Sequence, residues 1–156
     1  MKKLLILFIL LMCVGCNKVD VMKTNYDYYM NDLLSIHESS DYIPCDIEIT
    51  YDKITEEEVS YQIIIDNPKE NMRNINIVVS HDMKTADGYP SIGVFDTEPI
   101  NLLVKQTEEN SNKGIVLVGY FKYSGELEDL NAQFKVSLNY INDAIEEKTV
   151  YFIQSI

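Results

Sequence analysis

A change of hydrophobic period at Asp46 constrains the fold of this 156-residue chain more than any other feature. From there onward apolar and polar residues alternate: Ile47, Ile49 and Tyr51 are each separated by a polar residue, and residues 134–140 repeat the pattern. A period of two puts successive side chains on opposite faces of a β-strand. The sequence therefore predicts β-structure over the rest of the chain.

Turn-forming residues divide this region into seven or eight short strands, and they cluster at residues 66–68, 87–88, 108–113 and 123–125. No helical period intervenes, which argues against parallel βαβ units. The spacing favours one antiparallel β-sandwich over residues 44–156 that resembles immunoglobulin-like and fibronectin-III-like domains. A flattened β-barrel is the alternative. The resemblance is architectural, since the chain has no Trp and no pair of Cys residues in this region.

Three apolar segments refine this strand prediction. Residues 92–95 and 100–104 predict short strands. The nearly continuous apolar run from Ile115 to Phe121 predicts a central strand, buried on both sides or packed across from a helix.

The N-terminus has the features of an export signal. A cationic start at Lys2 and Lys3 precedes 11 apolar residues, too few to span a membrane, which takes about 20. Residues 13–16, Cys-Val-Gly-Cys, resemble the lipobox of bacterial lipoproteins, although Cys13 stands where Leu is usual. The resemblance implies removal of residues 1–15 and lipidation of Cys16 by a diacylglyceryl group and a fatty-acyl chain such as palmitate. The expected location is the extracytoplasmic face of the cell membrane.

Residues 16–43 form the expected linker between this anchor and the domain. Within it, apolar residues recur with the spacing of one helix face: Tyr26, Tyr29, Met30, Leu33 and Leu34. A helix this short is marginally stable alone. We expect it either to pack on the domain or to form part of a stalk.

Charge and cysteine content limit the partners and the chemistry. The formal charge is −12, and it becomes −14 when Lys2 and Lys3 leave with the signal. Such an acidic surface disfavours nucleic acid as a partner. After processing only Cys45 remains as a free thiol, so no intramolecular disulfide is expected. Its acidic neighbours favour a small buried apolar residue with a raised thiol pKa over a nucleophile.

The sequence holds no recognisable catalytic or metal-binding motif. His37 and His81 are 44 residues apart and are expected to be solvated. Adjacent strand residues point to opposite faces, so Ser80, His81 and Asp82 cannot form a triad. Asp82, Asp87 and Asp96 lack the spacing of a calcium loop, and a turn explains the Asp-Gly pair. We therefore expect no enzyme activity, no metal and no cofactor.

Eleven Tyr residues provide the best indication of binding, because Tyr combines apolar area with a polar tip. The predicted contact surface is the polar loop of residues 81–90 with residues 92–95. Its candidate binding residues are His81, Asp82, Asp87, Tyr89 and Phe95. The expected function is interaction with an envelope protein, or an accessory role in an envelope assembly. The alternative is a lipoprotein that presents a small molecule, a glycan or an ion to a transporter.

Overall fold

The computed structural model describes residues 17–85, 88–106 and 112–156. One helix precedes a set of short strands. In chain order the elements are α2 (Asn17–Ser35), β1 (Asp46–Thr55), β2 (Glu58–Asp66), β3 (Arg73–His81), β4 (Ser91–Ile92), β5 (Gly114–Lys122), the 3-10 turn η2 (Leu127–Asp129), β6 (Gln133–Ile141) and β7 (Glu147–Ser155). Cys16 and the predicted signal lie outside the described residues.

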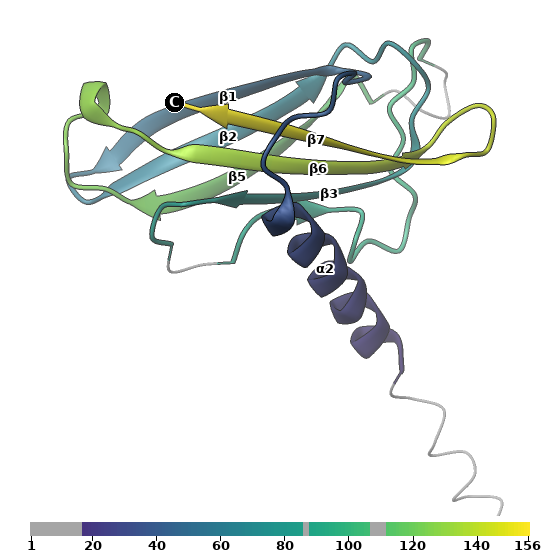
Figure 1. Cartoon of the computed structure of the whole chain (residues 1–156), viewed down its shortest axis with the longest axis horizontal. Helices are drawn as coiled ribbons and strands as arrows, with labels where there is room; N and C mark the ends of the chain where they lie inside the picture. The colour runs from purple at the N-terminus through teal and green to yellow at the C-terminus, as the bar shows by residue number, and fades with distance from the viewer. Residues whose placement is uncertain (1–16, 86–87, 107–111) are drawn as a thin grey trace, which may run out of the picture.

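The strands form two antiparallel sheets that face one another (Figure 1). One has the order β1-β2-β5 and the other the order β4-β3-β6-β7. The immunoglobulin constant domain likewise separates its first, second and fifth strands from its third, sixth and seventh, but here the fourth strand lies beside the third. The prediction of a mainly β sandwich preceded by a short helix is confirmed, and the structure shows no closed barrel.

Alternation along the strands builds the core. Odd-numbered residues of β2, β3 and β5 and even-numbered residues of β6 face inward, as the buried positions show. The largest fully buried side chains of this cluster are Tyr61, Ile63, Ile65, Met72, Ile75, Ile77, Leu102, Phe121, Phe134, Leu138 and Tyr140. Cys45 is buried with them, as expected, and burial raises the pKa of its thiol to about 12.

The central position predicted for residues 115–121 is wrong. Among the residues that the structure describes, β5 is an edge strand that pairs with β2 alone, and its residues alternate strictly between buried and exposed. Val116, Val118 and Tyr120 are 55%, 45% and 41% exposed. The run reads as continuous because apolar residues occupy the outer face as well as the inner one. An apolar sequence therefore does not by itself mean burial on both faces.

Gly119 fits β5 against its neighbour across the ladder. It lies opposite Tyr61 of β2. A Cβ at this position would lie 2.3 Å from Cζ and from the hydroxyl oxygen of Tyr61. The absence of a side chain therefore makes room for the largest aromatic ring of the core.

Helix α2 packs on the outer face of the second sheet, where it contacts β3 and β6. Met30 and Leu33 of the helix join Val78 and Val94 in a second apolar cluster, separate from the main core. Tyr26 and Tyr29 pack against this cluster as predicted, whereas Leu34 is 52% exposed. Figure 1 shows that the C-terminal end of α2 lies at the sheet and that its N-terminal end leaves the sandwich.

The segment after α2 forms hydrogen bonds along the free edge of β7. Ser40 donates its backbone N–H to the Tyr151 carbonyl at 2.8 Å, and its hydroxyl accepts from the Tyr151 N–H at 3.0 Å. Ser39 Oγ accepts from the Ile153 N–H at 2.9 Å. Lys135 Nζ donates to the Ile36 carbonyl at 2.6 Å and so binds the C-terminal end of the helix to β6.

The two shortest predicted strands are reduced in the structure. Residues 92–95 contribute only Ile92 to the two-residue β4, and residues 100–104 contribute a single bridge between Leu102 and Met72. No helix among the described residues has the length and apolarity that crossing a membrane requires.

Candidate binding groove beside helix α2

One hollow lies between the N-terminal half of α2 and the loop that follows β4. It has a volume of about 590 Å³, within the usual range of ligand sites. Val21, Met22, Asn25 and Tyr29 line it from the helix. Asn76 of β3 and loop residues 93–97 line the opposite wall, except that Phe95 does not contribute.

A second hollow of about 370 Å³ continues this groove toward the start of β3. The two share Asn76, Gly93, Asp96 and Thr97. Glu98 adds a second carboxylate to the lining. The groove therefore combines an apolar helix wall with amide and carboxylate groups, a combination that suits a neutral polar or cationic ligand.

Gly93 allows the loop that lines the groove to pack closely against β3. Its φ is +83°, and a Cβ there would lie 1.9 Å from the Ile75 carbonyl oxygen. Its N–H donates to Asp96 Oδ2 at 2.7 Å, which closes the turn. The loop can approach β3 this closely only because residue 93 has no side chain.

Phe95 lies beside the helix and not on a free contact surface. Its ring centroid is 5.4 Å from that of Tyr26, and half of the residue is exposed. Tyr89 packs against the cluster beneath α2, and its hydroxyl donates to the His81 carbonyl at 3.1 Å. Two residues of the surface predicted for a partner, Tyr89 and Phe95, thus pack beside the helix of the same chain.

His81 is not solvated as expected. It is 6% exposed at the end of β3, within 5.0–5.4 Å of four aromatic rings by centroid. These rings belong to Tyr61, Tyr89, Phe121 and Phe134. Neither ring nitrogen of His81 has a hydrogen-bond partner among the described residues. Burial therefore lowers the pKa of His81, while the nearby Met83 backbone and Asp82 partly oppose this shift.

Asp82 is exposed and serves the strand ladder. Its Oδ1 accepts from the Gln133 N–H at 2.9 Å, and its own N–H donates to the Gln133 carbonyl at 3.3 Å. Asp87 lies outside the described residues. The predicted binding residues therefore do not form one surface: His81 is internal, Tyr89 supports the helix, and only Phe95 borders the groove region.

Ser80 and His81 lie on opposite faces of their sheet. Ser80 is buried on the outer face of its sheet, whereas His81 faces the core. No three His, Cys, Asp or Glu side chains gather as metal ligands within residues 17–85, 88–106 and 112–156.

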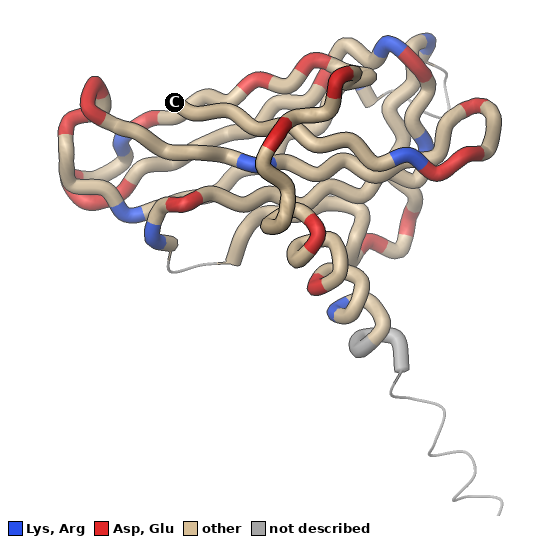
Figure 2. The backbone as a smooth tube through the Cα atoms, viewed as in Figure 1, with Lys and Arg blue, Asp and Glu red and all other residues tan. Residues whose placement is uncertain are grey.

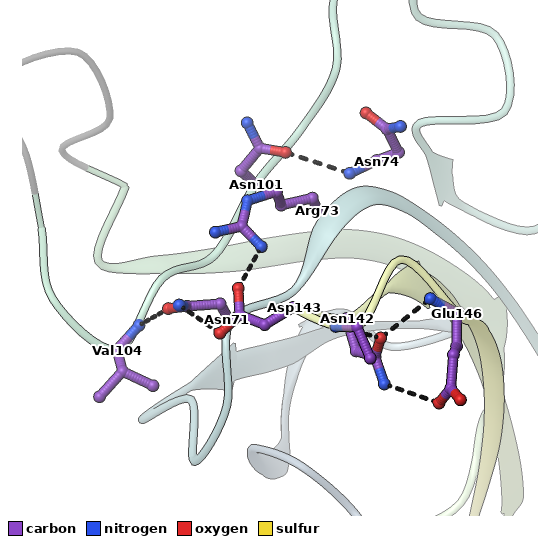
Figure 3. A network of polar contacts seen from close by, with 9 residues as sticks. Asn71, Arg73, Asn74, Asn101, Val104, Asn142, Asp143 and Glu146 are labelled. Carbon is purple, nitrogen blue, oxygen red and sulfur yellow. Dashed lines mark hydrogen bonds and ion pairs between the residues drawn. The ribbon is translucent and has the colours of Figure 1, made fainter.

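Sequence reasoning missed two features. Asn25, Asn76 and Gly93 line the groove, and only Gly93, directly before the apolar pair Val94 and Phe95, carries a local signal of close backbone approach. The other is an exposed polar network at one end of the sandwich (Figure 3).

In this network Arg73 Nη1 lies 2.5 Å from Asp143 Oδ1, and Asn71 Nδ2 donates to Asp143 Oδ2 at 2.9 Å. The Arg73 guanidinium and the Asn71 amide lower the pKa of Asp143. Asn71 Oδ1 also accepts from the Val104 N–H at 3.0 Å. These contacts join the β6–β7 hairpin to two other connections, so we assign the network to loop structure and not to ligand binding.

No protein-family model matches this chain, and neither a curated protein nor a solved structure matches it.

Proposed function

We propose that this protein is a lipid-anchored, non-catalytic interaction protein on the extracytoplasmic face of a cell membrane. The anchor rests on the lipobox-like residues 13–16 and the apolar segment before them. Acidic residues are spread over the loops and strand ends, which favours a protein partner over nucleic acid (Figure 2).

One observation carries the interaction role: the outer face of the sheet β1-β2-β5 has no covering element among the described residues. Along β5 it presents three exposed apolar side chains, those of Val116, Val118 and Tyr120. The partly exposed Ile64 lies opposite Val116 on β2 and extends this apolar stripe. Apolar side chains gathered on an exposed face are typical of protein contacts.

The anchor is tested by the intact mass of the membrane-extracted protein beside a Cys16→Ala variant. The expected result is loss of residues 1–15 and gain of a diacylglyceryl group, both abolished in the variant. Cleavage without a lipid would contradict the anchor.

The interaction is tested by a photoreactive aromatic residue placed at Tyr120 or at Tyr42 in membranes. Both side chains are exposed, but only Tyr120 lies on the apolar stripe. We expect one discrete cross-linked protein from position 120 and none from position 42. Equal capture at both positions would contradict an interaction through this face.

The second candidate function is ligand binding, and the groove beside α2 favours it. Native mass spectrometry of the extracted protein tests for a retained small molecule. Met22→Trp would fill the groove from the helix side and should release such a molecule. An identical mass for the folded protein before and after denaturation would contradict this second function.

A further inference from the structure

The hydrogen-bonding pattern of β5 leaves one backbone edge open. The Lys122 N–H donates to the Lys84 carbonyl at 2.8 Å, and the Tyr120 carbonyl accepts from Thr85 Oγ1 at 3.0 Å. These groups therefore point away from β2. Backbone direction alternates along an antiparallel ladder, and the register of β5 with β2 has no shift, so Val116 and Val118 point the same way.

Within residues 17–85, 88–106 and 112–156, no group outside the β2–β5 ladder forms a hydrogen bond with the backbone of Val116 or Val118. The described residues therefore leave this stretch of the edge open. Both side chains are exposed and apolar. The other edge of the same sheet differs, since β1 carries the exposed Glu48 and Asp52 on its outer face. Charged residues protect an edge strand from pairing, and the middle of β5 lacks them.

Positive charges lie at both ends of the open stretch. Lys84 and Lys122 are adjacent at one end, and Lys113 precedes β5 at the other. All three are exposed, and none forms an ion pair with a described residue. Glu58 lies opposite Lys122 in the ladder but forms no ion pair with it. Glu57 and Lys122 also line one hollow, so the cations at this end lie beside carboxylates with which they form no ion pair.

We propose that the edge of β5 binds an extended segment of a partner protein by strand addition. The segment has alternating apolar residues in its middle and carboxylates at its ends. Its backbone pairs with Val116 and Val118, its apolar side chains extend the stripe, and its carboxylates meet the lysines. A second copy of this chain fits less well, because antiparallel self-pairing would bring Lys113 of one copy near Lys122 of the other.

This inference rests on the proposed interaction role and specifies its mode. The probe is a synthetic peptide of nine residues, the length of β5. It has Val and Thr alternating in the middle and Glu at both ends, and the matched control peptide has Lys at both ends. Binding to the membrane-extracted full chain is followed by hydrogen exchange at the amides of Val116 and Val118.

We expect the Glu-ended peptide to slow exchange at both amides and the Lys-ended peptide to bind more weakly. The double variant Lys84→Glu, Lys122→Glu should weaken binding of the Glu-ended peptide about fivefold, since two exposed ion pairs are lost. It should also favour the Lys-ended peptide. The control variant Lys23→Glu, Lys105→Glu makes the same charge change at lysines that also lack an ion pair with described residues.

Three results would overturn the proposal. They are unchanged exchange at Val116 and Val118, equal weakening by the two double variants, and protection without peptide that grows with protein concentration, which would mean self-pairing. A partner captured in membranes through Tyr120, together with unchanged exchange at Val116 and Val118, would leave the interaction role intact and refute only strand addition.

Discussion

The outer faces of the two sheets differ in how far they are exposed. Val78 on the outer face of β3 is 1% exposed because α2 covers it, whereas Val118 on the outer face of β5 is 45% exposed. The buried face is not apolar throughout, since Ser80, Ser137 and Asn139 all lie within it. The comparison shows that burial of an outer face here depends on which segment packs across it, and not on how apolar its own residues are.

The same substitution made on both outer faces tests this difference in burial most directly. Val78→Asp would place an unpaired charge beneath the helix and should lower the free energy of unfolding by about 3 kcal/mol or release α2. Val118→Asp should change it by less than about 0.5 kcal/mol. Denaturant unfolding with protease digestion of the helix measures both effects. Equal losses would mean that α2 does not cover Val78 in solution.

Two adjacent leucines of α2 test whether one face of the helix packs on the sheet. Leu33→Ala removes a side chain that is 0% exposed and should lower the free energy of unfolding by about 2–3 kcal/mol. Leu34→Ala removes a half-exposed one and should cost less than about 0.5 kcal/mol. Thermal unfolding of the two variants measures the difference. A helix that only forms a stalk would instead give two similar small effects.

On the inner side of the uncovered sheet, Gly119→Ala should lower the free energy of unfolding by about 2 kcal/mol, because the new Cβ overlaps the Tyr61 ring. Gly88→Ala is the control, since a Cβ there meets nothing within 4 Å. Combining Gly119→Ala with Tyr61→Leu should recover part of the loss. No recovery in the double variant would place the strain elsewhere.

The smallest effect concerns pH. The folded-state pKa of His81 is lowered, so as pH falls below about 6.5 the unfolded chain takes up this proton first and stability decreases. The slope from this ring is at most about 1.4 kcal/mol per pH unit, and it ends below the folded-state pKa. His81→Phe should flatten the stability profile between about pH 7 and 5.5. Chemical denaturation across this range measures the slope, and an unchanged slope in His81→Phe would contradict the assignment.

Local sequence predicted the features that depend on period. Alternation at Ile47, Ile49 and Tyr51 placed β1, and the spacing of Tyr26, Met30 and Leu33 placed the buried face of α2. These patterns succeed because a strand or helix buries its own repeating face.

Features that depend on distant segments were not predictable in the same way. Burial of His81 requires rings from three other strands and one loop, and the groove requires the loop at Gly93 to meet both α2 and β3. The edge position of β5 follows from the order of the strands in the sheet. The spacing of apolar residues along one strand does not predict that order. For this reason the sequence did not predict that Tyr89 packs against the cluster beneath α2.

The attachment of α2 has a consequence for how this domain would search for partners. Hydrogen bonds from Lys135, Ser39 and Ser40 bind the chain after the helix to the sandwich, and the 19 residues of α2 span about 28 Å. With the lipid anchor we propose at Cys16, an arm of this fixed length would limit how far the domain reaches from the membrane. The effective concentration of the domain would then be highest for partners within that reach.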